Sequence, residues 1–253
     1  MMAQSKYILA LLTFITIGMI IGSLFQLAFI WRLEEPSGTS HWENDKEASL
    51  LRHGLVKPEI LSWSPRVILF HNFLSMEVVT SYLSIYSYFP QGMKSDVRTS
   101  SGMFLSSEER KYPIIEAIEK RIAVFSQVPA ENGELIQVLR YETNQFYRPH
   151  HDYFSDTFNL KRGGQRVATM LMYLSDDVEG GETYFPMAGS GECSCGGKVV
   201  KGLCVKPNKG DAVLFWSTGL DGETDPNSLH GGCAVLRGEK WSATKWMRQK
   251  TSF

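Results

Sequence analysis

The stretch LIQVLRYETNQFYRPHHDYF, residues 135–154, opens the part of the chain that decides the fold. It starts with a short β-rich run, and similar runs follow at 167–174, 212–217, 232–236 and 240–247. The sequences GG, DG, NKG and DPN between these runs are turn signals. Several short strands without alternating helices predict a sandwich or jelly roll rather than a parallel sheet.

Two amphipathic helices are predicted on the N-terminal side of these strands. Ser75 precedes a segment whose apolar residues share one face, and Ser107 opens a second such segment that runs to Phe125. Residues 32–60 are polar, contain Pro and Gly and lack periodicity, which is typical of a stem. We therefore expect the folded domain to span residues 61–253.

Residues 7–31 contain no charged side chain and lie between Lys6 and Arg32. A membrane-spanning helix needs about 20 apolar residues, so this segment is predicted to be a transmembrane signal anchor behind a cytosolic tail, residues 1–6. The alternative is a signal peptide that is removed after targeting. The flanking charges favour an N-terminus in the cytosol, which makes a single-pass type II protein of the endoplasmic reticulum and/or Golgi membrane with a lumenal domain.

Within this segment Gly18 and Gly22 form a G-x-x-x-G pattern. Through it the span could contact a second copy or a related isoform, although a chance spacing gives the same pattern. The formal net charge of the chain is -1, which supplies no basic field for phosphates and argues against nucleic acid as a partner.

The sequence RPHHDYF contains a potential metal-binding pair, His150 and Asp152. In an extended strand the side chains of residues i and i+2 point to the same face, whereas His151 would face away. The only later histidine is His230. Two histidines and one carboxylate that leave open coordination positions are typical of non-haem Fe(II) oxygenases. A hydrolytic zinc centre and an ordinary surface pair are the alternatives.

Lys240 lies ten residues after His230 in HGGCAVLRGEKWSATKW. A lone lysine is most often an exposed turn residue. An oxygenase that uses 2-oxoglutarate, however, must bind a second carboxylate at some distance from the iron, and an ammonium on a long stem does this as a point charge. The combination of H-x-D, a distal His and this Lys is far more specific than any one of its parts.

The chain resembles the membrane-anchored plant type of prolyl 4-hydroxylase over residues 61–248. The resemblance rests on the following segments: SWSPRVILFHNFLS (62–75), VRTSSGMFL (97–105), QVLRYETNQFYRPHHDYF (137–154), GGQRVATMLMYLSDDVEGGETYFP (163–186), VKPNKGDAVLFWS (205–217) and DPNSLHGGCAVLRGEKWSATKW (225–246). It implies an α+β fold in which a double-stranded β-helix, or jelly roll, has supporting N-terminal helices and follows one transmembrane helix.

The resemblance also implies the activity: hydroxylation at C4 of peptidyl proline in proline-rich proteins, coupled to oxidative decarboxylation of 2-oxoglutarate to succinate and CO2. O2 is the second co-substrate, and ascorbate keeps the iron reduced. A proline-rich substrate in the polyproline II conformation is already extended and loses little conformational freedom on binding.

Matching positions give the expected site residues. The resemblance assigns Fe(II) to His150, Asp152 and His230 and the distal carboxylate of 2-oxoglutarate to Lys240. The remaining assignments are Tyr141, Thr183 and Trp246 in the co-substrate pocket, Tyr147 and Arg166 beside the proline-binding groove, and residues 98–105 in a loop that closes over the peptide.

The cysteine region, GECSCGGKVVKGLCVKP, departs from the family pattern. We expect Cys233 to pair with Cys195 or Cys193, which would tie a loop to the strand of His230, and Cys204 to pair with the remaining member. A zinc site formed by these cysteines is the alternative.

Two rival functions are compatible with the same residues. One is a related 2-oxoglutarate hydroxylase that acts on another peptidyl residue, such as lysine. The other is a non-catalytic lumenal jelly roll that binds proline-rich peptides or glycans. The presence of His150, Asp152, His230 and Lys240 together argues against the second, because a degenerate site would have lost some of them.

Overall fold

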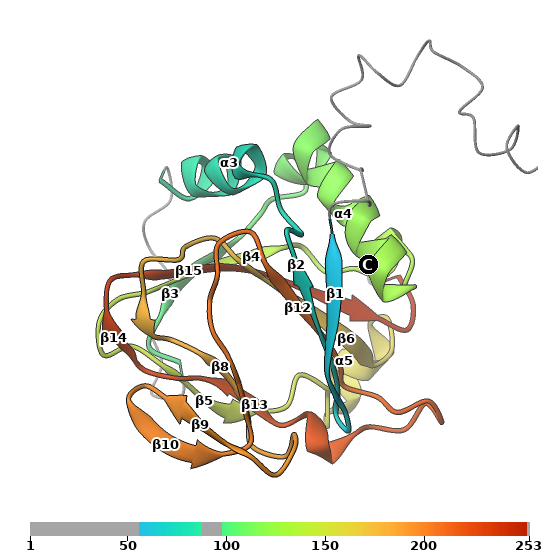
Figure 1. The fold of residues 1–253 in the computed structure, drawn as a ribbon. Coiled ribbons are helices and arrows are strands. Elements are labelled where there is room, and N and C mark those ends of the chain that lie inside the picture. The colour runs from blue at the N-terminus through green and yellow to red at the C-terminus, as the bar shows by residue number, and fades with distance from the viewer. Residues whose placement is uncertain (1–55, 88–97, 252–253) are drawn as a thin grey trace, which may run out of the picture. The chain divides into compact units, whose positions relative to one another are not determined.

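The computed structural model describes residues 56–87 and 98–251, which form the β-rich domain in Figure 1. The strands of this domain are β1 (Lys57–Trp63), β2 (Arg66–His71), β3 (Ser101–Phe104), β4 (Gln137–Tyr141), β5 (Tyr147–His150), β6 (Arg166–Tyr173), β7 (Glu179–Gly180), β8 (Thr183–Phe185), β9 (Glu192–Cys195), β10 (Lys198–Lys201), β11 (Leu203–Val205), β12 (Ala212–Trp216), β13 (His230–Gly232), β14 (Val235–Arg237) and β15 (Lys240–Arg248). The helices are α3 (Met76–Ser87), α4 (Pro113–Ser126) and α5 (Thr157–Lys161), with short 3₁₀ turns at Glu109–Lys111, Ala130–Asn132 and Pro226–Ser228.

The described residues form four antiparallel sheets, of which two are large and two are the two-stranded pairs β9–β10 and β7–β14. The major sheet has seven strands in the order β1-β2-β12-β6-β15-β4-β3, and the minor sheet has four in the order β11-β8-β13-β5. Strands distant in sequence are neighbours in both sheets, and β5, β8 and β13 lie across from β15 and β4 in Figure 1. This is a mostly β arrangement of the jelly-roll type, with few helices, as the spacing of the β-rich runs predicts.

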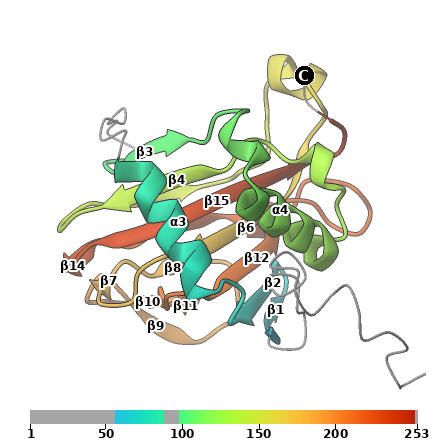
Figure 2. The same cartoon turned by 90° about the horizontal axis from the view of Figure 1, so that it is seen from above.

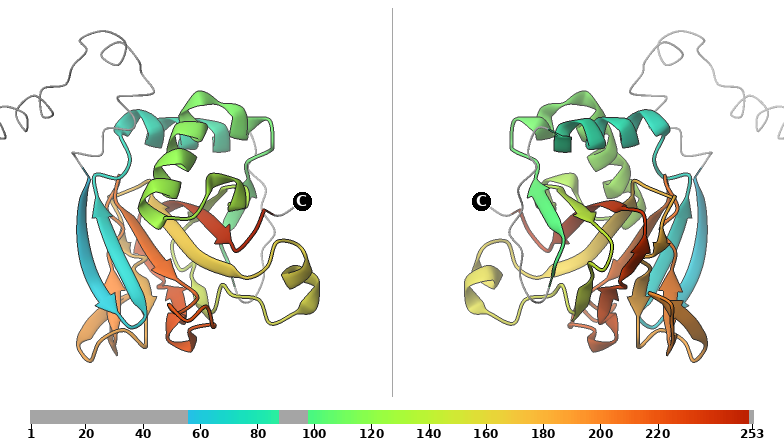
Figure 3. Two further views of the ribbon diagram at one scale, coloured as in Figure 1. Left: turned by 90° about the vertical axis from the view of Figure 1, so that its right-hand side faces the viewer. Right: turned by 90° about the vertical axis from the view of Figure 1, so that its left-hand side faces the viewer.

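The period-two alternation of the central strands gives the major sheet two different faces. On β6, Ala168, Met170 and Met172 belong to the apolar core beneath the helices, whereas Tyr173 belongs to the cluster on the side of the minor sheet. Helices α3 and α4 cover the first face, as Figures 2 and 3 show. The second face is therefore left for the minor sheet and for the functional site.

A buried ion pair joins the helical layer to the sheet. Glu119 on α4 accepts a hydrogen bond from Lys245 on β15 and another from Arg110 at 2.7 Å. Lys245 is only 1% exposed, so a carboxylate partner is required to keep its charge in the interior. The pair fixes α4 against the strand that also carries Lys240 and Trp246.

The helices and strands differ in detail from the sequence prediction. The second helix begins at Pro113 rather than Ser107, because residues 109–111 form a separate 3₁₀ turn that ends before Pro113. Just ahead of this turn the Glu109 N–H donates to Ser106 Oγ at 3.2 Å, and the Ser106 N–H donates to Glu109 Oε2 at 2.6 Å. The predicted run 232–236 is divided between β13 and β14, which belong to different sheets.

The folded domain also begins earlier than expected. Residues 57–60, predicted as the end of the stem, form the first part of β1, which pairs with β2 across a tight turn at Ser64–Pro65. The predicted cytosolic tail, the transmembrane anchor, the G-x-x-x-G pattern and most of the stem lie outside the described residues. Within 56–87 and 98–251, no helix has the length and apolar character needed to cross a membrane.

Candidate metal centre and co-substrate pocket

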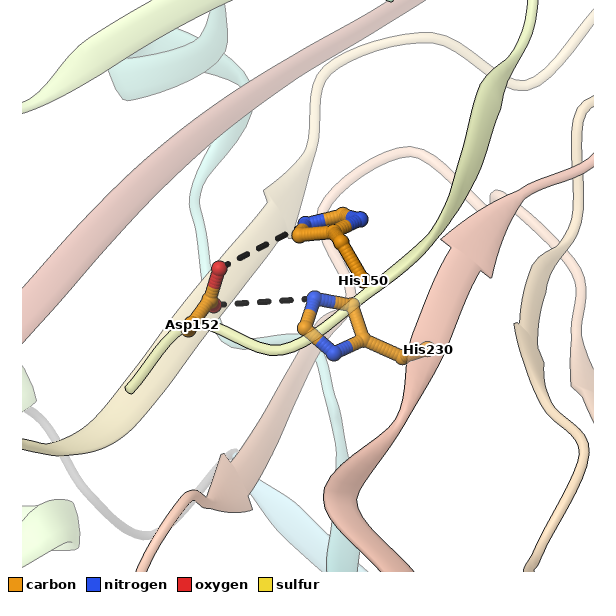
Figure 4. Close-up of side chains that lie close together, drawn as sticks. All are labelled: His150, Asp152 and His230. Carbon is orange, nitrogen blue, oxygen red and sulfur yellow. Dashed lines mark ion pairs between the residues drawn. The ribbon is translucent and has the colours of Figure 1, made fainter. Parts of the chain in front are cut away.

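Three side chains converge on one point, two from the neighbouring strands β5 and β13 and one from the bend that follows β5, as Figure 4 shows. His150 ends β5 and pairs directly with His230 at the start of β13, so the minor sheet places both imidazoles side by side. Asp152 Oδ1 lies 3.5 Å from His150 Nε2, and Asp152 Oδ2 lies 3.6 Å from His230 Nε2. One donor atom from each residue lies within 4.8 Å of the other two, a separation that a single metal ion can bridge.

The hydrogen bonds of the two histidines select the tautomer that a metal ligand needs. His150 Nδ1 donates to the Arg148 carbonyl and His230 Nδ1 donates to the Ser228 carbonyl, each at 2.9 Å. A carbonyl only accepts, so the proton resides on Nδ1 and the Nε2 lone pair of each ring is free. Burial lowers the pKa of His230 to about 4, which keeps this ring neutral at physiological pH.

Asp152 supplies the negative charge of the set. Burial alone would raise the pKa of this carboxyl group, but the adjacent His230 and His150 rings and a hydrogen bond from Thr169 hold it below its usual range. Thr169 Oγ1 donates to Asp152 Oδ2 at 2.6 Å. His151 faces away, as predicted: its Nε2 lies 2.9 Å from the Pro226 carbonyl and its ring stacks on Tyr153.

This donor set fits ferrous iron. Two neutral imidazoles and one carboxylate on one side of a pocket match the facial arrangement that non-haem Fe(II) enzymes use, with positions left open for other ligands. His150 Nδ1, His230 Nδ1 and Asp152 Oδ2 each have a hydrogen-bond partner in the protein, which leaves His150 Nε2, His230 Nε2 and Asp152 Oδ1 as the atoms that could bind a metal. His150, Asp152 and His230 would hold the iron.

A pocket with about 480 Å³ of empty space, its open mouth included, extends from these three residues between the two sheets. Lys240 on β15 lines it, is 3% exposed, and has its Nζ 5.5 Å from the ring centroid of Tyr141 and 5.8 Å from that of Tyr173. Among the described residues, no carboxylate lies within ion-pair distance of this ammonium. Burial lowers the pKa of Lys240 to about 8, and the negative charge of Glu182 opposes that shift. Such a buried cation is suited to an anionic ligand.

Comparison with known proteins agrees with this geometry. A family model described as the 2OG-Fe(II) oxygenase superfamily matches residues 136–248. Prolyl 4-hydroxylase 1 of Arabidopsis thaliana is 65% identical, with 98% of each chain covered. Probable prolyl 4-hydroxylase 3 of the same plant is 50% identical over 80% of this chain and 76% of its own length.

The chain belongs to the plant prolyl 4-hydroxylase family.

A solved structure adds a bound co-substrate to this comparison. The viral collagen prolyl hydroxylase of Paramecium bursaria Chlorella virus-1, in its complex with 2OG, is 26% identical and covers 72% of this chain and 95% of its own, with a TM-score of 0.56. The prolyl 4-hydroxylase described here is thus an Fe(II)- and 2-oxoglutarate-dependent enzyme, and its jelly-roll fold is that of its relatives.

Most of the residues expected from the prolyl 4-hydroxylase resemblance line this pocket. Tyr141, Tyr147, Thr183 and Trp246 lie around it together with Lys240 and the three iron ligands. Thr183 Oγ1 lies 2.8 Å from the Tyr173 hydroxyl. The Tyr147 ring stacks on His150 with 3.7 Å between ring centroids, at the open end of the site.

Arg166 differs from the other expected residues because it does not line the pocket. Its guanidinium makes two hydrogen bonds to Glu134, at 2.8 and 2.7 Å, and lies 4.1 Å from the centre of the Trp246 ring. Arg166 therefore lies behind Trp246, and Trp246 itself lines the pocket. The expected loop 98–105 is partly regular structure, because residues 101–104 form β3 and pair with β4, whereas Arg98 reaches the pocket.

The four cysteines form two disulfide bonds, Cys193–Cys204 and Cys195–Cys233. The second joins the β9–β10 hairpin to the chain just after His230, in agreement with the expected pairing of Cys233 with a member of C-x-C. No free cysteine remains, so the zinc alternative is wrong for this structure.

Sequence reasoning missed several residues of the pocket wall. Ser242 and Thr244 lie at every second position of β15 between Lys240 and Trp246, so they share the strand face that lines the pocket. The period-two pattern of that strand could therefore have identified them. Thr169 carries no comparable local signal, because its contact with Asp152 joins β6 of the major sheet to the bend that follows β5.

Proposed function

We propose that this protein hydroxylates C4 of peptidyl proline in proline-rich secretory and cell-wall-type proteins, and that it couples this reaction to the conversion of 2-oxoglutarate to succinate and CO2. One observation carries the proposal. The His150–Asp152–His230 set and the buried ammonium of Lys240 lie in the same pocket between the two large sheets. In the described part of the chain, this ammonium has no carboxylate within ion-pair distance. A metal site with open positions and an anion site nearby are what a chelating dicarboxylate co-substrate requires.

The iron, when bound, supplies the activation of O2 and of 2-oxoglutarate. The protein residues bind and orient the substrates, and they exclude water. Lys240 neutralises the distal carboxylate of the co-substrate, and Thr183 and Tyr141 line the same end of the pocket. The apolar walls formed by Leu139, Leu171 and Phe215 keep bulk water from the reacting atoms.

The open end of the pocket suits a proline ring. Tyr147 is stacked on His150, and its ring is half-buried, so a flat aromatic surface begins directly beside the metal ligands. Trp246 lines the same pocket and is held by the Arg166 guanidinium. Flat aromatic surfaces of this kind accept proline-rich segments, which are pre-organised in the polyproline II conformation. Because Arg166 is engaged by Glu134, we infer that it acts on the substrate through the position of Trp246 and of the Glu134 carboxylate.

The cellular setting is also a proposal. The apolar segment 7–31 supports a single-span anchor in the endoplasmic reticulum and/or Golgi membrane, with a lumenal catalytic domain. The two disulfide bonds support an oxidising compartment. Association with a second copy or a related isoform through the span would follow from the same anchor.

The test uses the full-length chain in detergent with Fe(II), ascorbate and 2-oxoglutarate labelled at C1. Release of labelled CO2 is measured with and without a proline-rich peptide, and the peptide is analysed by mass spectrometry and for 4-hydroxyproline. We expect release that depends on the peptide and a gain of one oxygen at C4 of proline. A matched peptide with alanine in place of proline should support no product.

Two outcomes would favour the rival functions. Hydroxylation of a lysine-containing peptide in place of the proline-rich one would assign the chain to a related hydroxylase. Peptide binding without CO2 release by folded, iron-loaded protein would leave only a binding module.

A further inference from the structure

Asp152 is the least supported of the three metal ligands by its own backbone. His150 and His230 are paired across β5 and β13, so the minor sheet fixes both. Asp152 lies in a bend beyond the last residue of β5, outside any strand. The simple alternation that predicts convergence of His150 and Asp152 in one strand therefore does not explain how the carboxylate is held.

Two side chains hold this segment, one from strand β6 of the major sheet and one from the residue just before it. Thr169 Oγ1 donates to Asp152 Oδ2 at 2.6 Å. Two residues beyond Asp152, the Gln165 side chain binds both backbone groups of Phe154: Nε2 donates to the carbonyl at 2.9 Å, and the Phe154 N–H donates to Oε1 at 2.5 Å. Asp152, Gln165 and Thr169 are all at most 7% exposed, so water does not compete strongly for these bonds.

The hydroxyl of Thr169 is itself at a fixed point. Its residue pairs with Phe215 on β12 and with Trp246 on β15, so strands on both sides hold the backbone. A β-branched side chain has few χ1 rotamers available, and Thr169 is 1% exposed. The position of the carboxylate relative to the major sheet is thus set by one hydrogen bond from a rigid donor.

We propose that Thr169 is a positioning residue: its hydrogen bond occupies Asp152 Oδ2, which lies 3.6 Å from His230 Nε2, and leaves Oδ1 as the oxygen that would bind the metal. This inference rests on the Fe(II) site of the proposed function. A carboxylate that ligates through one oxygen keeps the three protein donors on one face, which leaves the opposite face for 2-oxoglutarate and O2. Binding through both oxygens would occupy a position that the reaction needs.

The experiment compares Thr169→Val, which removes the hydroxyl but keeps the branched shape, with Thr169→Ser, which keeps the hydroxyl. The full-length proteins are titrated anaerobically with Fe(II) and Co(II), and the Co(II) ligand-field spectrum reports the number of ligands. We expect Thr169→Val to weaken metal binding by about 10–100-fold, the usual loss when a group behind a metal ligand is removed, and to change the Co(II) spectrum. Thr169→Ser should have the metal affinity and the Co(II) spectrum of the wild type.

Ser217→Ala is the matched control. Ser217 directly follows β12, and its fully buried hydroxyl has no hydrogen-bond partner and does not line the pocket. Its removal should therefore leave the metal affinity and the Co(II) spectrum unchanged. Should Thr169→Val fail to fold, Thr169→Ala provides a smaller variant without the hydroxyl. The thermal midpoint of the apoprotein is recorded for each, because a purely structural role would change stability without changing the spectrum.

The outcomes separate this inference from the proposed function. Wild-type metal affinity and an unaltered Co(II) spectrum in Thr169→Val would overturn the inference, even if the wild-type enzyme hydroxylates proline. Equal losses in Thr169→Val and Thr169→Ser would assign the effect to packing and would also overturn it. A wild-type protein that binds no Fe(II) would instead remove the proposed function.

Discussion

At the scale of single residues, Lys240 is the side chain whose chemistry is most directly measurable. Its ammonium is buried, has a pKa of about 8, and has no carboxylate partner within ion-pair distance in the described part of the chain. Below this pKa the lysine is charged and attracts the distal carboxylate of 2-oxoglutarate. Above it the free enzyme carries a neutral amine, so a proton must be taken up before the ion pair forms. We expect the dissociation constant for 2-oxoglutarate to increase as pH rises through about 8, by about tenfold per pH unit at the limit.

Two variants of Lys240 serve as controls for this pH dependence. Lys240→Arg keeps a permanent charge, so its affinity for 2-oxoglutarate should no longer change through pH 8, although the larger planar group fits the pocket less well. Lys240→Met should bind the co-substrate weakly at every pH. Calorimetric titrations with anaerobic Mn(II)-loaded protein measure all three. An unchanged pH profile in Lys240→Met would exclude this lysine as the source of the effect.

Asp152 is the only anionic member of the metal site. We expect Asp152→Ala to abolish turnover and to leave the protein without bound iron after purification, because two neutral imidazoles alone hold Fe(II) weakly. Metal content by elemental analysis and peptide-dependent CO2 release test this directly. His151→Ala is the neighbouring control, since that ring faces away from the centre, and it should retain iron and activity. Normal turnover in Asp152→Ala would contradict the assignment of the centre.

At the scale of elements, the two disulfide bonds differ in what they connect. Cys195–Cys233 spans 38 residues and joins β9 to the segment after His230, whereas Cys193–Cys204 spans 11 and joins β9 to β11. In the chain-entropy account, the free energy of unfolding should fall by about 4 kcal/mol when the first is removed and about 3 kcal/mol when the second is removed. The two bridges should differ more in their effect on metal affinity than in their effect on stability, because only Cys195–Cys233 lies beside a metal ligand.

We therefore expect the double variant Cys195→Ser/Cys233→Ser to lose metal affinity as well as stability. The double variant Cys193→Ser/Cys204→Ser should lose stability while keeping metal affinity close to that of the wild type. Denaturant unfolding of the apoproteins and anaerobic Fe(II) titration give the two readouts. Equal metal affinity in both double variants would show that the Cys195–Cys233 bridge does not support His230.

The elements also show which parts of the fold a sequence can predict. The runs that became β4, β6, β12 and β15 were predictable because each is a buried strand of a large sheet and is rich in apolar and β-branched residues. Strand β5 was not among them, because Arg148 and Pro149 are exposed and give it no apolar pattern. The division of 232–236 between two sheets depends on which distant strands are its neighbours, β8 and β5 for one part and β7 for the other.

The same distinction applies to the site. The three metal ligands and Lys240 follow from residue type and spacing together with the family resemblance, and the structure brings them into one pocket. The contacts of Thr169 with Asp152 and of Glu134 with Arg166 join residues that are 17 and 32 positions apart. No local pattern encodes them, since each joins a residue of β6 to a residue outside the strands and arises only in the folded domain.

At the scale of the whole molecule, residues 7–31 and the catalytic domain make a joint prediction about the membrane. If the apolar segment is an anchor, the full-length chain should stay with membranes after alkaline carbonate extraction, and a chain that lacks residues 1–31 but enters the secretory pathway behind a cleavable signal should be released. In sealed microsomes, the catalytic domain should resist added protease until detergent is supplied, because a type II orientation places it in the lumen. An epitope tag before Met1 separates the anchor from a signal peptide: an anchor retains the tag on the mature protein, whereas cleavage removes it. A domain digested in intact microsomes would reverse the orientation and would place the two disulfide bonds in a reducing compartment, where such bonds are rare.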